Sequence, residues 1–166
     1  MGQTLAVSDL LPGALADRYA AWMTDALAEA RAALTTGDVP VGAVVVDADG
    51  EVVGAGRNRR TADGDPLAHA EVLALRAAAE RRGGWRLDDC TLVVTLEPCA
   101  MCAGAVAQAR LQRVVLGAWD AKAGAAGSRW DLLRDTRAPH WVEVVGGVRQ
   151  QECAALLTDF FRARRP

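Results

Sequence analysis

The sequence predicts a three-layer α/β fold, in which a mixed five-stranded sheet is flanked by helices. Segments with helical and β-strand patterns follow one another in the order α-β-β-α-β-α-β-(α)-β-α, which is typical of a sheet covered by helices. The first two β-rich segments are separated by a short turn and favour an antiparallel hairpin. The connection before the last β-rich segment is long enough for a crossover between parallel strands. A sheet with both kinds of pairing is mixed.

The first helix and the hairpin come from the N-terminal third of the chain. Apolar residues recur at helical spacing over residues 14–34, and Gly37 supplies a stop for that helix. Residues 41–46 and 52–56 are β-rich, and the turn residues at 47–50 join them.

A loop rich in arginine and asparagine is expected over residues 57–64, before the second helix. Asp65 offers an N-cap and Pro66 suits the first helical position, so this helix is predicted to begin there and to end at Gly83. A short strand is expected over residues 91–95.

The C-terminal half continues the alternation of helices and strands. A helix is predicted over residues 97–109 and a strand over 113–117. The long connection that follows is expected to carry a short helix at 130–134, before a last strand at 142–145. A terminal helix is predicted over residues 150–164.

Length, charge and hydropathy restrict the class of protein. The 166 residues suit a single domain over residues 1–166, with about residues 1–13 flexible. A net charge of −2 gives no global field that attracts nucleic acid, so any RNA binding must depend on local basic patches. There is no run of about 18 apolar residues and no basic region before an apolar N-terminal stretch, so we expect a soluble cytoplasmic protein.

The four cysteines divide into two kinds. Cys99 and Cys102 form a C-x-x-C pair, which points to metal or redox chemistry. Cys90 and Cys153 have no partner at motif spacing, and we expect them to be small buried hydrophobic residues. Without a secretory signal, this number of cysteines does not predict a disulfide framework.

Two short segments carry side chains suited to binding one metal ion. His69 and Glu71 lie near the start of one predicted helix, and Cys99 and Cys102 open the next. Cys99 and Cys102 are three residues apart, so on a helix they share a face, and the helix N-terminus favours their thiolates. Two thiolates, one imidazole and an open fourth position describe a catalytic zinc site. Because positions 69 and 71 face different ways on an ideal helix, we infer that the helix end faces the metal.

Simpler explanations exist for each part of this pattern. A single histidine before a helix is more often a surface or core residue, and a C-x-x-C pair alone could be a redox pair or half of a structural zinc site. The two segments together, in this order, favour catalysis, because a structural site would need a fourth ligand and only Glu71 is near. The other histidine, His140, lies beside Pro139 and Trp141 and is expected to serve packing.

The pairing of H-x-E with P-C-x-x-C matches the signature of the zinc deaminases. The chain resembles the bacterial tRNA-specific adenosine deaminases from about Tyr19 to Arg165. The shared segments are VPVGAVVVDADGEVVGAGRNRR (39–60), DPLAHAEVLALR (65–76), TLVVTLEPCAMCAGAV (91–106), DAKAGAAGS (120–128) and ECAALLTDFFRARR (152–165). The first three occur across the cytidine-deaminase-like superfamily, whereas the last two favour the tRNA enzymes.

The resemblance implies a cytidine-deaminase-like fold, one Zn²⁺ per subunit and a homodimer with the active site near the subunit interface. Its zinc ligands would be His69, Cys99 and Cys102. In this chemistry zinc lowers the pKa of its water, and Glu71 accepts and donates the protons.

The resemblance also implies a substrate, which is the wobble adenosine in the anticodon stem-loop of arginine tRNA, deaminated to inosine. Asn58 would contact the nucleoside, and the backbone around Leu96 and Glu97 would lie beside the base. Asp120 and Lys122 would lie near the anticodon loop. The terminal arginines Arg162, Arg164 and Arg165 would lie near the phosphates.

Two other functions remain open from the sequence. A deaminase of free guanine or cytosine would share the zinc site and the mechanism and differ only in substrate. A zinc-stabilised RNA-binding module would need the metal ligands but not Glu71. Ammonia release and the effect of replacing Glu71 separate these alternatives.

Overall fold

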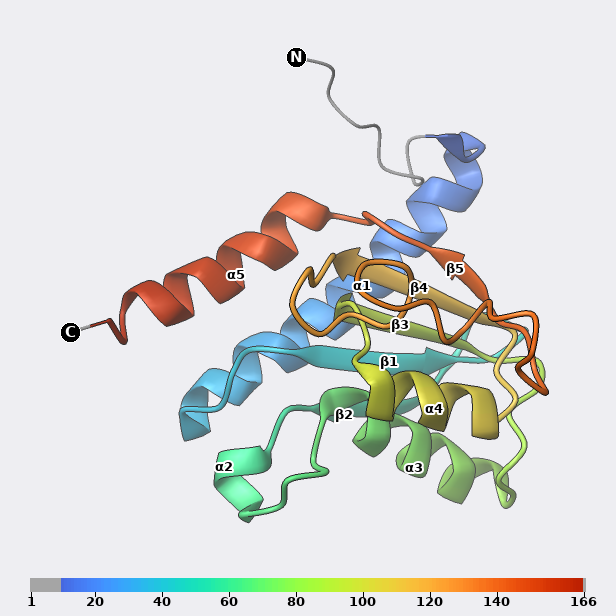
Figure 1. Ribbon diagram of the computed structural model, residues 1–166, viewed down its shortest axis with the longest axis horizontal. Coiled ribbons are helices and arrows are strands. Elements are labelled where there is room, and N and C mark those ends of the chain that lie inside the picture. Colours follow the sequence, from blue (N-terminus) through green and yellow to red (C-terminus); the bar gives the residue numbers. More distant parts are fainter. Residues whose placement is uncertain (1–9, 166) are drawn as a thin grey trace.

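A five-stranded mixed sheet forms the centre of the molecule, as the computed structural model shows for residues 10–165 (Figure 1). The strands lie in the order β2-β1-β3-β4-β5. β1 pairs antiparallel with both β2 and β3, whereas β3 pairs parallel with β4, and β4 with β5. The strands are β1 (Gly42–Val46), β2 (Val52–Arg57), β3 (Thr91–Leu96), β4 (Arg113–Ala118) and β5 (Glu143–Val145).

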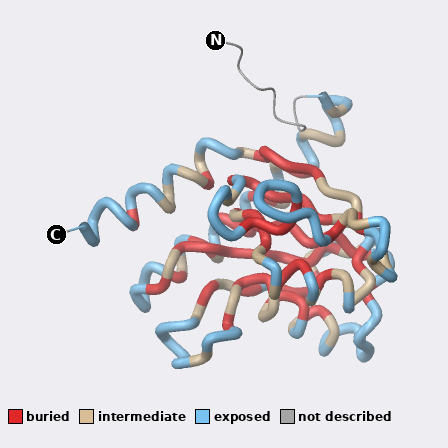
Figure 2. The backbone as a smooth tube through the Cα atoms, in the orientation of Figure 1, coloured by how far each residue is buried: buried red, intermediate tan, exposed pale blue. Residues whose placement is uncertain are grey.

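Helices cover both faces of this sheet and complete the three layers predicted from the sequence. Residues of α1 and α5 share one hydrophobic cluster with β1, β3 and β4, and residues of α3 and α4 share the other. The sheet between them is almost entirely buried, while α5 is largely exposed (Figure 2). The helices are α1 (Gly13–Ala33), η2 (Leu34–Thr36), α2 (Arg60–Asp63), α3 (Ala70–Arg82), α4 (Ala100–Gln108) and α5 (Gln150–Arg162).

The strand directions place several connecting loops at the same end of the sheet. β2 and β3 are both antiparallel to β1, so they run in the same direction, and β4 runs with β3. The carboxyl ends of β2, β3 and β4 therefore lie at the same end of the sheet. In α/β sheets ligands bind at the carboxyl ends of the strands.

α3 packs on β2 with almost no space between the two backbones. A Cβ atom on Gly54 would lie 2.4 Å from the carbonyl oxygen of Ala74, and one on Gly56 would lie 2.4 Å from that of Ala70. Glycine at these two strand positions therefore allows the close approach. As a result the N-terminal end of α3, with His69 and Glu71, is fixed beside the carboxyl end of β2.

Two helices begin later than the sequence predicts. α3 begins at Ala70 and not at Pro66, because the side chain of Asp65 accepts a hydrogen bond from the amide of Leu67 at 2.8 Å and forms a turn. α4 begins at Ala100, with Cys99 as its N-cap.

The long connection and the arginine-rich loop also differ from prediction. No helix forms at 130–134, where Leu132 and Trp130 instead bond to the backbone of Ala125 and Gly124. The loop at 57–64 contains the short α2, whose amides at Thr61 and Ala62 donate to the carboxylate of Asp38. Such a cap from a residue more than 20 positions away leaves no local signal in the sequence.

Within residues 10–165, no helix is long and apolar enough to cross a membrane. The predicted flexible segment at about 1–13 falls mostly outside the described residues, and Gly13 already belongs to α1.

Candidate active site

The N-terminal ends of α3 and α4 bring the predicted metal ligands together. His69 is the N-cap of α3 and Cys99 is the N-cap of α4, while Cys102 lies in the first turn of α4. The Nδ1 atom of His69 lies 3.7 Å from Sγ of Cys99 and 3.4 Å from Sγ of Cys102. The inference that helix ends, rather than helix sides, face one point agrees with this geometry.

This group fits a tetrahedral zinc ion. The three ligand atoms lie within 4.8 Å of one another. Zn–S and Zn–N bonds of about 2.3 and 2.0 Å at tetrahedral angles separate sulfur from nitrogen by about 3.5 Å, which is close to the observed distances of 3.7 and 3.4 Å. Two thiols and one imidazole are also the donors that zinc prefers, and they leave a fourth position open.

The pKa values of the two thiols are shifted in opposite directions. Hydrogen bonds from Cys102 and His69 lower the pKa of Cys99 to about 3. The hydrogen bond to Cys99, together with burial, raises the pKa of Cys102. The two adjacent sulfurs therefore share one negative charge between them. A divalent ion would stabilise both thiolates, so metal binding would release a proton.

Glu71 is a buried carboxyl group beside these ligands. It lies in the first turn of α3 and is only 4% exposed. Burial raises the pKa of Glu71 to about 7, and the nearby charge of His69 only partly opposes this effect. A carboxyl group with such a pKa can both accept and donate a proton near neutral pH.

A pocket of about 180 Å³ lies beside His69, Glu71 and Cys99, at the carboxyl ends of the strands. Three of the predicted substrate residues, Asn58, Leu96 and Asp120, line it together with Glu71 and the predicted metal ligands His69 and Cys99. They come from the ends of β2, β3 and β4, which lie at the same end of the sheet, with β1 between β2 and β3.

The fourth predicted substrate residue is outside the pocket lining. Lys122 is exposed, and its amide donates to the side chain of Asp120 at 3.0 Å. It therefore lies in the turn next to the pocket. Arg60, for which the sequence provided no role, lines the pocket and is exposed.

Asn58 is held in place by two hydrogen bonds of its side chain. Its Nδ2 donates to the carbonyl oxygen of Val39 at 3.2 Å, and its Oδ1 accepts from the amide of Arg60 at 3.1 Å. One further N–H and one lone pair of this amide remain for a ligand. These two hydrogen bonds hold the side chain of Asn58 in the pocket wall, directly after β2.

The side chain of Glu97 lines the pocket beside Leu96 and has a role that the sequence did not indicate. It is buried and accepts hydrogen bonds from residues 120–128. The only local signal in the sequence is an acid directly before Pro98 and Cys99, and its hydrogen-bond partners lie more than 20 residues away.

The residues expected to serve packing do so. Cys90 and Cys153 are buried, and burial raises the pKa of each to about 11. His140 bonds through Nε2 to the carbonyl oxygen of Leu111 at 2.7 Å, away from the metal ligands. Of the adjacent phenylalanines in α5, Phe160 is buried and Phe161 is exposed.

Comparison with known proteins agrees with this site. Residues 17–118 match the cytidine and deoxycytidylate deaminase zinc-binding region, and the chain belongs to this family of zinc-binding deaminases. Within it, the chain is 45% identical over 144 residues to a tRNA-specific adenosine deaminase of Bacillus subtilis, a match that covers 87% of this chain and 89% of the relative.

Solved structures show the same fold. One comes from a study of A-to-I editing by tRNA:A34 deaminases at the wobble position of transfer RNA. It superposes with a TM-score of 0.79 at 41% identity and covers 82% of this chain and 99% of its own. A guanine deaminase from Bacillus subtilis superposes with a TM-score of 0.59 at 39% identity, covering 65% and 69%.

Proposed function

We propose that this chain deaminates adenosine to inosine at the wobble position of an arginine tRNA anticodon, with one zinc ion per subunit. The observation that carries the proposal is the pocket itself, where a His-Cys-Cys group and the buried Glu71 face residues from three strand ends. The relative from Bacillus subtilis, matched over most of both chains, supports tRNA as the substrate.

The reaction adds water to the ring carbon that bears the amino group and releases ammonia. His69, Cys99 and Cys102 would hold the zinc, which when bound activates water at its open position. The carboxylate of Glu71 would accept a proton from the attacking water and pass it to the ring nitrogen. It would then take up the remaining proton and donate it to the departing amino group.

Residues at the strand ends would hold the nucleoside. The free N–H and lone pair of Asn58 would bond the substrate, and the backbone at Leu96 would lie along the base. Asp120 would face the substrate from the opposite loop, with Lys122 outside the pocket and close to the anticodon phosphates. Arg162, Arg164 and Arg165 would add charge at the end of α5.

A single-stranded loop suits the shape of this site. A base must leave its stack to reach a zinc deep in a pocket, and an anticodon loop permits this at low energetic cost. A tRNA substrate would place the enzyme in the cytoplasm. We further propose that the whole chain acts as one domain, because helices from both ends of the sequence pack on the same sheet face.

Sequencing of arginine tRNA after incubation with the enzyme tests the proposal. Inosine is read as guanosine, so the expected result is a change from adenosine to guanosine at the wobble base alone. Incubation with the Glu71→Gln variant is the control and should leave adenosine. An unchanged wobble base with wild-type enzyme that contains zinc would contradict the proposal.

The similarity to a guanine deaminase favours a second candidate, the deamination of a free base. The metal group and Glu71 would serve both reactions, so only the substrate separates them. Ammonia release from guanine, cytosine and an anticodon stem-loop should be compared at several salt concentrations. Turnover of the stem-loop should fall steeply with salt, because phosphate contacts release counterions. Turnover of a free base alone would establish the second candidate.

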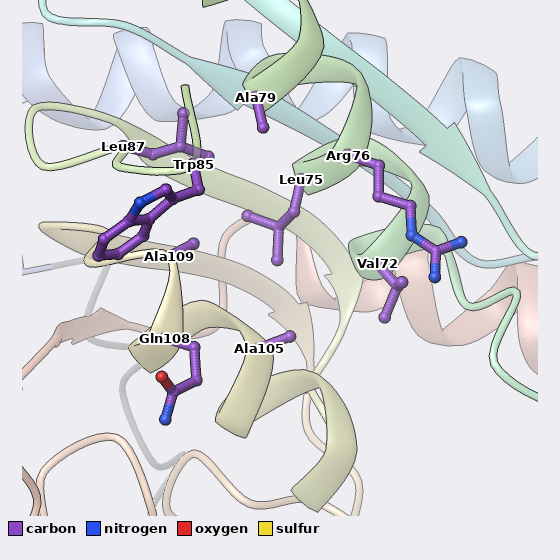
Figure 3. A pocket seen from close by; sticks show the side chains of 9 residues that line it. All are labelled: Val72, Leu75, Arg76, Ala79, Trp85, Leu87, Ala105, Gln108 and Ala109. Carbon is purple, nitrogen blue, oxygen red and sulfur yellow. The ribbon is translucent and has the colours of Figure 1, made fainter. Parts of the chain in front are cut away.

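We also propose a homodimer in which a second copy covers the groove between α3 and α4. This groove has a volume of about 550 Å³ and is lined mainly by apolar side chains of the two helices and of Trp85 (Figure 3). Trp85 is 60% exposed at its edge. Because the same helices carry the metal ligands at their N-terminal ends, a partner on this groove would lie near the active site, as the family resemblance implies.

Sedimentation equilibrium of paired tryptophan variants tests the dimer. Trp85→Glu should produce monomers, because it places a charge in the apolar groove. Trp141→Glu replaces another tryptophan, 58% exposed, outside the groove and should leave the dimer intact. A monomeric wild type, or a dimer that survives Trp85→Glu, would contradict this interface.

A further inference from the structure

A single buried carboxylate organises the loop that forms one wall of the pocket. Glu97 follows β3 directly and is only 2% exposed. Its oxygens accept hydrogen bonds from the amides of Asp120 at 2.8 Å, Ala126 at 3.0 Å and Ser128 at 3.0 Å. The hydroxyl group of Ser128 donates a further hydrogen bond. Glu97 thus binds both ends of the loop over residues 120–128.

The same loop lies against the segment that carries a metal ligand. The amide of Ala125 donates to the carbonyl oxygen of Pro98 at 2.8 Å, and Gly124 forms an isolated β-bridge with Cys99. Gly124 packs so closely on the carboxylate that a Cβ atom there would lie 2.2 Å from Oε2 of Glu97. The loop has therefore little freedom to shift while Glu97 keeps its four hydrogen bonds.

The position of this loop sets the shape of the pocket. Asp120 and Ala123 line the same pocket as Asn58. The side chain of Asp120 is fixed in turn, because Oδ1 accepts from the amides of Lys122 at 3.0 Å and Ala123 at 3.3 Å. A movement of the loop would therefore also move the side chain of Asp120 in the pocket wall.

We propose that Glu97 is a positioning residue for the substrate, which sets the pocket wall by holding residues 120–128. The proposal rests on the proposed deamination of an RNA loop and adds to it the group that shapes the binding wall. A carboxylate is suited to this task because it only accepts hydrogen bonds and all four partners are donors. Glutamine has one acceptor oxygen and would place its NH₂ group against backbone N–H groups, so several buried donors would lose their partners.

Glu97→Gln is the direct test, with kinetics on an anticodon stem-loop and metal analysis. The expected result is a rise in KM of about tenfold or more, with kcat changed less than about threefold and the zinc content unchanged. A loss of kcat at unchanged KM would overturn the proposal, because it would place Glu97 in the chemical step. A loss of zinc would also overturn it.

Two further variants change the contact between Glu97 and the loop over residues 120–128. Gly124→Ala introduces a methyl group against the carboxylate and should raise KM as Glu97→Gln does. Ser128→Ala removes one of the four hydrogen bonds and should raise KM less than Glu97→Gln. Glu80→Gln makes the same change of charge on an exposed face of α3 and is the matched control.

Hydrogen–deuterium exchange tests the positioning role without any substrate. In Glu97→Gln, amides of residues 120–128 should exchange about tenfold faster or more, while those of β1 and α1 stay as in the wild type. Unchanged exchange in the loop would overturn the proposal. If the wild type fails to deaminate the stem-loop, the proposed function fails, and exchange still decides the role of Glu97.

Discussion

The two sides of the pocket are built in different ways. The metal side consists of two helix N-termini, and its four candidate functional residues fall within two segments of three and four residues. The substrate side consists of connections after β2, β3 and β4, held by hydrogen bonds between residues such as Glu97 and Ser128, which are 31 positions apart. Local sequence therefore determines the chemistry, whereas distant contacts determine what the pocket accepts.

This difference predicts a hierarchy of effects. Changes on the metal side should remove the metal or the reaction. Changes on the substrate side should weaken binding and leave zinc in place. Variants of the two sides, compared in the same assays, show whether the division holds.

The largest effect is expected from loss of a metal ligand. Cys99→Ala should lose zinc and activity, and a loss of about 3 kcal/mol in the free energy of unfolding would lower Tm by roughly 10 °C. Metal analysis and thermal unfolding measure both. Cys153→Ala, which removes a buried thiol outside the metal group, should keep its zinc and serves as the control. Full zinc occupancy in Cys99→Ala would contradict the assignment of the ligands.

Next in size is the effect of removing the proton carrier. Glu71→Gln keeps the size of the side chain and should lower kcat by about 10³-fold or more, because the amide cannot accept a proton. Zinc content should equal that of the wild type. Single-turnover kinetics on the stem-loop, with Glu80→Gln for comparison, provide the measurement. Equal, measurable rates in Glu71→Gln and the wild type would contradict the role of Glu71 as proton carrier, whereas stem-loop binding without turnover in either protein would favour a zinc-stabilised RNA-binding module.

A smaller effect is expected on the substrate side at Asn58. Asn58→Ala loses the bonds to Val39 and Arg60 and the amide that faces the pocket. We expect kcat/KM to fall by about 10- to 100-fold, with zinc retained, since two or three hydrogen bonds are lost. Loss of zinc in this variant would show that the two sides of the pocket are not independent.

The smallest effect is expected at Lys122, outside the pocket. Lys122→Ala should lower stem-loop binding by about two- to fivefold and reduce the slope of log K against log salt by about one, because one phosphate contact is removed. Arg81→Ala, at the far end of α3, is the matched control and should leave the slope unchanged. An unchanged slope in Lys122→Ala would exclude a phosphate contact.

The sequence predicted which residues come together at the metal side of the pocket. His69, Glu71, Cys99 and Cys102 form two short motifs, and the inference that helix ends face the metal follows from the spacing of residues 69 and 71. The fold class and the parallel crossover to β5 also agree with the structure. These features depend on local patterns or on the order of elements along the chain.

Features that depend on distant partners were not predictable in the same way. α2 forms because Asp38 caps it, and the loop at 120–128 takes its shape from Glu97. The expected helix at 130–134 is absent because Trp130 and Leu132 bond to Gly124 and Ala125 instead. In each case a hydrogen bond between separate segments outweighs the local preference of the chain.

Zinc content of the purified protein, with X-ray absorption at the zinc edge, tests the central claim most directly. We predict one zinc per chain, with two sulfur ligands, one histidine nitrogen and one light-atom ligand at the open position. Cys99→Ala should show none, and Glu71→Gln should match the wild type. Folded wild-type protein without zinc, or a zinc with four protein ligands, would contradict a catalytic metal held by these two helix ends.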